Sequence, residues 1–272
     1  MLRLISIEFF KLRNTKFFWV LSGLFIVVLI AIPISVKLFL DYLTSIGDNP
    51  FRIGIAPNQL PLFDFVDIWQ NLTWTYSFLS IFLGFIAVIS VCNEFTYGTI
   101  KQNVIDGMSR RELFLSKIGF VTVLSIVMSL AVGLVGLITG FFLSPVKSLP
   151  FILQNIEFLP AYTLHLIAFQ LFCMIAALII KRPGITLAGL MFYIYFLEPI
   201  LVAFMKYEWN IPFWADLLPI KAIGNVIPLP FPKYVLMETE TFVPLDHLGI
   251  HLLYLLIFWF VADRLMVKRD LN

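Results

Sequence analysis

The sequence has little charge for its length. Only 13% of its 272 residues are Asp, Glu, Lys or Arg, whereas an ordinary soluble domain carries about 25%. Hydrophobic residues make up 60% of the chain, and the mean hydropathy is +0.95. This composition excludes an ordinary soluble domain and predicts an integral membrane protein.

The groups that metal and nucleophilic chemistry need are also scarce. The two cysteines, Cys92 and Cys173, lie inside apolar runs, so we interpret them as small core residues rather than a disulfide or metal site. His247 and His251 share a helix face without a third ligand; we favour polar residues at a helix start, with Asp246 as N-cap, and expect no metal site. The motifs GxxxxGK[ST], HExxH and GxSxG are absent, so we expect neither ATP binding in a phosphate loop nor enzymatic activity on this chain.

The hydrophobic residues form runs long enough to cross about 30 Å of hydrocarbon as helices. We therefore predict an all-α membrane protein with a single transmembrane domain, 1–272, and six spans at about 17–40, 72–92, 118–143, 163–180, 185–205 and 248–267. Residues 1–16 alternate apolar and basic residues at helical spacing, which favours an amphipathic interfacial helix over a merely topological flank. Residues 206–247 hold prolines and short apolar pieces, so we expect short interfacial or re-entrant helices there.

The distribution of basic residues orients these spans. If both termini are cytoplasmic, the inner segments hold 13 of the 19 Lys and Arg residues: Arg3, Lys11, Arg13, Lys16, Lys101, Arg110, Arg111, Lys117, Lys181, Arg182, Arg264, Lys268 and Arg269. Cytoplasmic loops carry such an excess of Lys and Arg. The count predicts that both termini and the polar stretch 93–117 face the cytoplasm.

The stretch 93–117 carries its own helix signals. Asp106-Gly107 is a turn signal, and Ser109 with Glu112 three residues later is a capping box at a helix start. We therefore predict a helix, a turn and a new helix. A short helix held between two spans suits the transmission of motion from a partner, whereas a solvated loop without a partner needs neither a capping box nor an apolar stripe. The apolar contacts would be Ile100, Val104 and Ile105, and the polar contacts Gln102, Asn103 and Asp106.

Glu94 sits near the end of the helix that precedes this stretch, where a lone carboxylate opposes the helix dipole. We expect it to pair with Arg110 or Arg111 across the turn and so to brace the loop.

The order and spacing of Glu94, Gly98-Thr99, Arg110 and Lys117 resemble the permease subunits of type-2 ATP-binding-cassette transporters. The basic N-terminus with Glu8 and Lys11, the six spans and the long segment before the last span are similar too. The resemblance implies that 93–117 is a cytoplasmic coupling loop whose helix docks on a separate ATPase subunit. We assign the contact with this partner to Thr99, Ile100, Gln102, Asn103, Val104, Ile105, Asp106, Gly107 and Met108. From the residues themselves we assign the bracing of the loop to Glu94, Ser109, Arg110 and Glu112.

The same resemblance implies the partners. ATP and Mg²⁺ would bind the ATPase and no cofactor would bind this chain, while a second permease copy or a similar chain would complete a dimer in a bacterial cytoplasmic membrane. Membrane lipids would surround it, and we expect no nucleic-acid partner. The predicted function is an exporter subunit that alternates its access; the alternatives are a non-transporting anchor for an ATPase and an ATP-independent channel or carrier. The sequence does not indicate the substrate.

Two features inside the spans have open interpretations. Glu198, beside Pro199, is an acidic residue well inside a span; it marks a pathway, or else braces a break in span 5 against the outer helices, which we favour. Gly136 and Gly140 form a small-xxx-small pair, which we assign to packing within the bundle rather than to a dimer contact.

Overall fold

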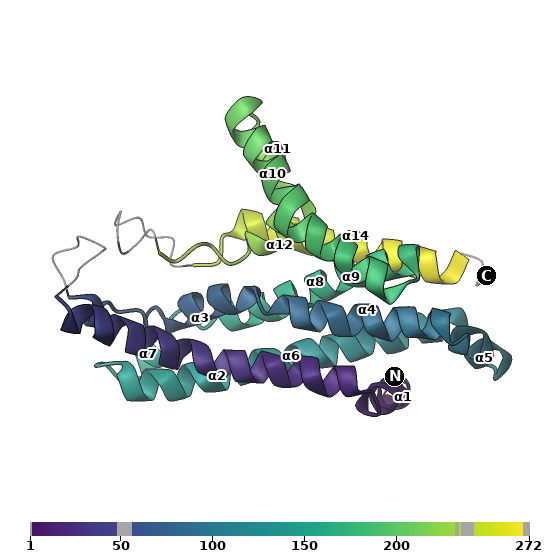
Figure 1. Ribbon diagram of the computed structural model, residues 1–272, viewed down its shortest axis with the longest axis horizontal. Helices are drawn as coiled ribbons and strands as arrows, with labels where there is room; N and C mark the ends of the chain where they lie inside the picture. The colour runs from purple at the N-terminus through teal and green to yellow at the C-terminus, as the bar shows by residue number, and fades with distance from the viewer. Residues whose placement is uncertain (1, 48–55, 232–233, 235–241, 269–272) are drawn as a thin grey trace.

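The computed structural model describes residues 2–47, 56–231, 234 and 242–268, and every regular element in these ranges is a helix. The long helices lie side by side in an elongated bundle (Figure 1). They are α2 (Lys16–Ser45), α4 (Ser80–Thr96), α6 (Arg110–Leu143), α8 (Phe158–Ile180) and α14 (Leu245–Lys268). The all-α prediction is confirmed.

Five helices of the described chain are long and apolar enough to cross a membrane, and there are six if a bent pair of helices is counted as one span. This pair is α3 (Ile68–Ser77) and α4, which meet at an angle of 43°. The second span predicted at 72–92 corresponds to this bent pair. The carbonyl group of Tyr76 accepts hydrogen bonds from the Leu79 N–H and the Tyr162 hydroxyl, and this pairing replaces the regular helix bond at the break.

The central helix α8 packs against α3, α4, α6, α9 and α14. One polar group buried on α8 has its partner on a neighbouring helix: Gln170 is fully buried, and its Nε2 atom donates to the Ser125 hydroxyl of α6 at 2.7 Å. Around α8 the apolar side chains form two clusters. One lies toward α3 and includes Trp69, and the other lies toward the C-terminal half of α4 and includes Phe114.

The glycines of α6 allow α3 and the segment before it to approach closely. A Cβ atom at Gly136 would lie 2.9 Å from Trp69, and one at Gly140 would lie 2.5 Å from Phe65. The assignment of this small-xxx-small pair to packing within the bundle is thus confirmed.

Span 5 begins beside α4 and α8, and its second half projects away from the bundle (Figure 1). It consists of α9 (Pro183–Phe192), a π-helical turn at Tyr193–Leu197, α10 (Glu198–Ala203) and a second π-helical turn at Phe204–Glu208. The expected break at Pro199 is absent. Proline lacks a backbone N–H, but Pro199 lies in the first turn of α10, directly after the π-helical turn, where the regular α-helical hydrogen bonds are already interrupted.

Short helices follow span 5, as predicted: α11 (Pro212–Asp216) and α12 (Pro219–Gly224). Asp246 is not the N-cap of the last span, because α14 already begins at Leu245. His251, expected near a helix start at the interface, is fully buried in the bundle.

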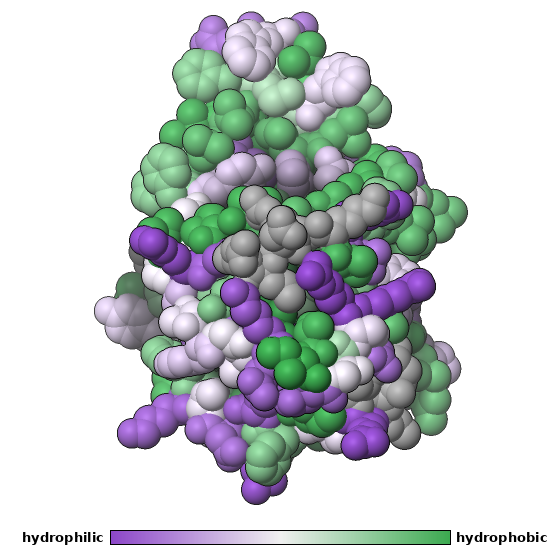
Figure 2. All heavy atoms as spheres, turned by 90° about the vertical axis from the view of Figure 1, so that its right-hand side faces the viewer, coloured by the Kyte–Doolittle hydropathy of each residue, from purple (hydrophilic) through white to green (hydrophobic). Residues whose placement is uncertain are grey.

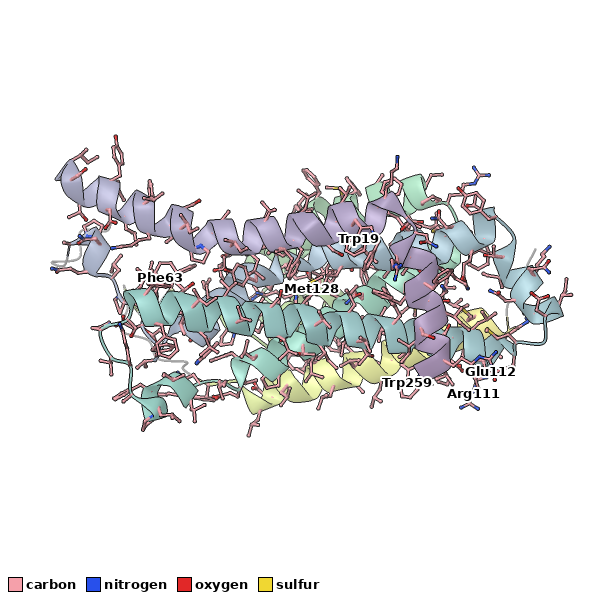
Figure 3. The ribbon with its side chains drawn as sticks, turned by 90° about the horizontal axis from the view of Figure 1, so that it is seen from below. Trp19, Phe63, Arg111, Glu112, Met128 and Trp259 are labelled. Carbon is pink, nitrogen blue, oxygen red and sulfur yellow. The ribbon has the colours of Figure 1, made fainter. Side chains whose placement is uncertain are left out.

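The remaining small elements are α1 (Leu2–Arg13), η1 (Pro57–Gln59), α5 (Thr99–Ile105) and α7 (Leu149–Leu153). The helix α1 crosses the bundle below α2 and α6, at the end where α6 begins and where Arg111 and Glu112 lie (Figure 3). That end also carries α5 and the last turn of α14 (Figure 1).

Candidate functional site

The helix α5 is held by local signals on both sides. Gly98 precedes it with φ of 67°, a left-handed conformation that glycine adopts without a Cβ penalty. Gly107 follows it with φ of 95°. Ser109 then caps α6: its hydroxyl accepts from the Glu112 N–H at 3.2 Å, and the Glu112 carboxylate accepts from the Ser109 N–H at 2.8 Å. The predicted turn and capping box are confirmed.

The two sides of α5 differ sharply in exposure. Ile100 is only 2% exposed and belongs to the apolar cluster around α8, and Val104 packs against the same cluster. Ile105 is 77% exposed. The assignment of Ile100 to the partner-facing surface is therefore wrong. The helix α5 has apolar residues on two sides, and the side that carries Ile100 packs on the apolar cluster around α8.

The polar residues assigned to partner contact also divide by exposure. Thr99, Gln102, Asp106 and Gly107 are exposed, and Gln102 donates to Asp106 at 3.2 Å. Asn103 and Met108 are half-buried. Figure 2 looks onto this end of the molecule, where hydrophilic side chains project around apolar patches.

A compact group of four charges lies beneath α5, which we call the elbow cluster: Glu8 and Lys11 of α1, Glu94 of α4 and Lys117 of α6. The Lys117 ammonium lies 3.1 Å from Glu8 and 3.0 Å from Glu94, and the Lys11 ammonium lies 3.3 Å and 3.0 Å from the same two carboxylates. Lys117 also donates to Ser90 at 3.2 Å. The cluster joins three helices by alternating charges.

The elbow cluster is buried, which makes its neutrality important. Glu8, Glu94 and Lys117 are 2%, 5% and 3% exposed. Burial alone would raise the pKa of Glu8, but the ammonium groups of Lys117 and Lys11 outweigh it and hold that pKa below its ordinary value. Removing one charge would leave an uncompensated charge in an apolar surrounding.

The expected pairing of Glu94 with Arg110 or Arg111 is wrong, since its ion pairs are with Lys11 and Lys117. Arg110 instead donates to the carbonyl oxygen of Val267 at 3.1 Å and so links α6 to α14. The sequence did contain a signal for one of the true partners: Lys117 is the last charged residue of a helix that is uncharged from Ile118 onward.

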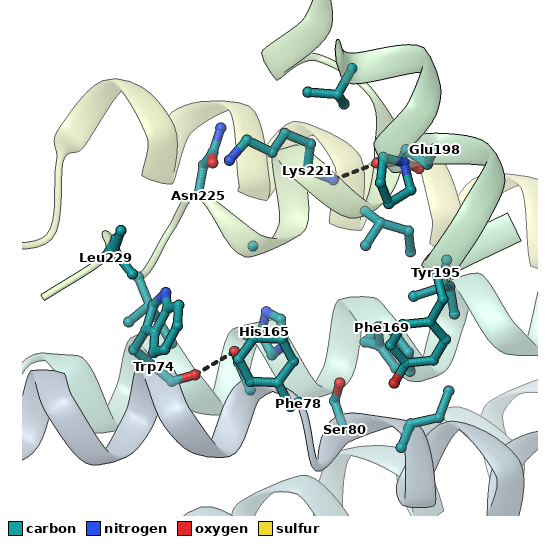
Figure 4. Close-up of a pocket in the computed structure, with 18 of the residues that line it drawn as sticks. Trp74, Phe78, Ser80, His165, Phe169, Tyr195, Glu198, Lys221, Asn225 and Leu229 are labelled. Carbon is teal, nitrogen blue, oxygen red and sulfur yellow. Dashed lines mark hydrogen bonds between the residues drawn. The ribbon is translucent and has the colours of Figure 1, made fainter. Parts of the chain in front are cut away.

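Glu198 lies at the start of α10 and is 2% exposed. Its Oε1 atom accepts from the Lys221 backbone N–H at 2.6 Å (Figure 4). This bond joins span 5 to α12, as the bracing interpretation expected. Glu198 also lines a cavity, so the two interpretations do not exclude one another.

No group of three or more His, Cys, Asp or Glu side chains suited to a metal ion occurs in the described ranges. A family model described as "ABC-2 family transporter protein" matches residues 4–198. These residues include the elbow cluster, α5 and the capping box. A comparison with curated proteins found no match.

Proposed function

Because the chain belongs to the ABC-2 family of transporter proteins, and so is a membrane-spanning component of a transport system, we propose that it is the permease subunit of an ATP-driven exporter. A cytoplasmic ATPase subunit docks on α5 and supplies the energy, with ATP and Mg²⁺ bound on that partner. Two such permeases, or this chain and a similar one, form the pathway in a bacterial cytoplasmic membrane.

The observation that carries this proposal is the construction of α5. Its inner side is fixed to the membrane core through Ile100, while Ile105 projects 77% exposed at the tip of the bundle. An exposed apolar side chain on a polar loop is a candidate anchor for a protein partner. Around it Lys101, Gln102 and Asp106 offer hydrogen-bonding groups.

A docked partner would move more than α5. The helix sits between α4 and α6, and the elbow cluster ties both to α1. Because buried ion pairs and packed side chains resist small deformation, a displacement of α5 shifts these helices together. The partner's ATP-driven closure would then bias the bundle between two arrangements, inward and outward accessible.

The docking can be tested by photocrosslinking in native membranes. A photoreactive phenylalanine derivative replaces Ile105, and a matched variant carries it at Ile46, which is 53% exposed at the opposite end of α2. We expect the Ile105 position alone to crosslink to an ATP-binding-cassette ATPase, identified by mass spectrometry. The same ATPase crosslinked at both positions, or at neither, would refute docking on α5.

The coupling between this permease and the ATPase identified by crosslinking is tested next. Ile105→Asp should separate the two subunits and abolish the stimulation of ATPase activity that the permease causes, while Ile46→Asp should leave both unchanged. A complex that forms but shows no permease-dependent ATPase activity would support an anchor instead. Flux in liposomes that contain the permease alone would support a channel or carrier.

A further inference from the structure

A cavity of about 580 Å³ lies at the junction of α3 and α4, facing α8, α12 and the start of α10 (Figure 4). Its volume falls in the range of ordinary ligand sites, about 300–1,000 Å³. It is far from α5, and docking of an ATPase does not require it.

Two irregular helix segments border this cavity. Ser77 and Phe78 lie at the 43° break between α3 and α4, and the π-helical turn Tyr193–Leu197 leads directly into Glu198. In a membrane, interrupted backbone is tolerated where protein or a polar cavity surrounds it, and π turns concentrate at functional sites. Two such segments on one cavity indicate a wall shaped for a ligand rather than a packing defect.

One wall of the cavity presents a buried carboxylate with an unused oxygen. Glu198 Oε1 accepts the Lys221 N–H, but Oε2 has no hydrogen bond of ordinary geometry, although the Tyr193 hydroxyl faces the same carboxylate. A buried acceptor without a partner costs free energy. A ligand with N–H donors would remove that cost.

The floor of the cavity adds a buried histidine. His165 is 5% exposed, and its Nδ1 atom lies 3.2 Å from the Ile223 carbonyl oxygen. Its Nε2 atom has no hydrogen bond of ordinary geometry, and the Ser77 carbonyl group is a further backbone partner of the ring.

The opposite rim carries a cation. The Lys221 side chain runs away from Glu198 toward Asn225 (Figure 4). Its ammonium group has no ion pair within the described ranges. Asp216 is a nearby carboxylate, but it pairs with Lys206 at 2.8 Å. The cavity thus has a carboxylate acceptor on one wall and a positive charge that points away from it, with aromatic side chains among its lining residues.

We propose that this cavity binds the headgroup of an aminophospholipid, phosphatidylethanolamine, from the surrounding bilayer. The primary ammonium group bonds to Glu198 Oε2, and the phosphate lies at Lys221. The glycerol and upper acyl chains pack on Trp74 and Phe78. A choline headgroup carries the same charges but has no N–H to donate, so it leaves Glu198 Oε2 unpaired.

Native mass spectrometry of the purified chain tests this proposal without an ATPase, so its outcome is independent of the proposed docking on α5. The probes are phosphatidylethanolamine and phosphatidylcholine with identical acyl chains, each titrated into the detergent. We expect the ethanolamine lipid to bind about tenfold or more tightly, the value of one charge-assisted hydrogen bond. Equal binding of the two lipids would overturn the proposal.

Three variants locate the binding. Glu198→Gln should remove the preference for ethanolamine, whereas Glu208→Gln, an exposed residue of the same span, should keep it. Gly224→Leu fills the cavity from a position where a Cβ atom meets nothing within 4 Å, and it should weaken both lipids while retaining every charged group. An unchanged preference in Glu198→Gln, or unchanged binding in Gly224→Leu, would place the lipid elsewhere and refute the assignment. Elution as a single symmetric peak in size-exclusion chromatography establishes that each variant is folded.

Discussion

Replacement of Lys117 by Met should destabilise the protein strongly. Lys117 is 3% exposed and lies 3.1 and 3.0 Å from two carboxylates. At an effective dielectric constant of about 20, each contact contributes about 5 kcal/mol of Coulomb energy before desolvation is subtracted. Methionine fills a similar volume, so the loss is mainly electrostatic. Breaking such a buried pair costs about 3–5 kcal/mol, because the remaining charge stays uncompensated.

The assay is the midpoint of thermal unfolding in detergent, followed by size-exclusion chromatography after heating. A chain of this size changes its midpoint by roughly 2–4 °C per kcal/mol, so Lys117→Met should lower it by roughly 6–20 °C. Lys147→Met, which changes an exposed lysine outside the elbow cluster, should leave the midpoint unchanged.

A second substitution separates charge balance from packing. Glu94→Gln in the Lys117→Met background leaves Glu8 with Lys11, whose atoms lie 3.3 Å apart, and restores neutrality. The double variant should recover more than half of the lost stability. If Lys117→Met shifts the midpoint by less than about 2 °C, or if the two substitutions are simply additive, the elbow cluster is not the buried, coupled unit described above.

Three further predictions concern the fold around the site. Gly140→Val should prevent stable folding or lower the unfolding midpoint by several degrees, because its Cβ atom would lie 2.5 Å from Phe65, whereas Gly189→Val meets open space and should be tolerated; similar yields and midpoints for both would contradict this packing. Ser109→Ala should cost about 1 kcal/mol through loss of the helix cap, and Ser109→Asp should restore the midpoint; equal midpoints for the alanine and aspartate variants would count against a capping role. Since the pKa of Glu8 is held below its ordinary value, its stabilising contribution is complete above the ordinary glutamate pKa of about 4.3 and is lost as the pH falls through the lower folded value. The difference in midpoint between the wild-type chain and Glu8→Gln should therefore be constant from pH 7 to about 5 and shrink below about 4, and a difference that grows on acidification would show the opposite sign of the shift.

Local signals in the sequence predicted local structure well. The capping box of Ser109 and Glu112 and the turn at Gly107 depend on residues within a few positions of each other, so the sequence contains the whole interaction. Long apolar runs likewise predict spans, because the hydrocarbon thickness sets the length of a helix that must satisfy its own backbone. The limits of α2 and α6 differ from the prediction mainly at their polar ends, where helices extend beyond the membrane.

The elbow cluster could not be derived in the same way. The partners of Glu94 come from α1, 83 residues away, and from the third turn of α6. A carboxylate at the end of a helix can pair with any cation that packing brings near, and the nearest cations in sequence, Arg110 and Arg111, are not its ion-pair partners.

The sequence alone determined the class of protein, its helices and the charged residues near one end of the bundle, since composition and helical periodicity act through short-range physics. Tertiary structure decided which side of α5 is buried, because Ile100 and Ile105 are equally apolar and only the core around α8 selects between them. It also decided the break at Tyr76, where the hydroxyl group of Tyr162 from a distant helix bonds to the backbone. Residues at that same break line the cavity at Glu198, together with residues of α8, α10 and α12, so the cavity too depended on packing between segments far apart in the chain.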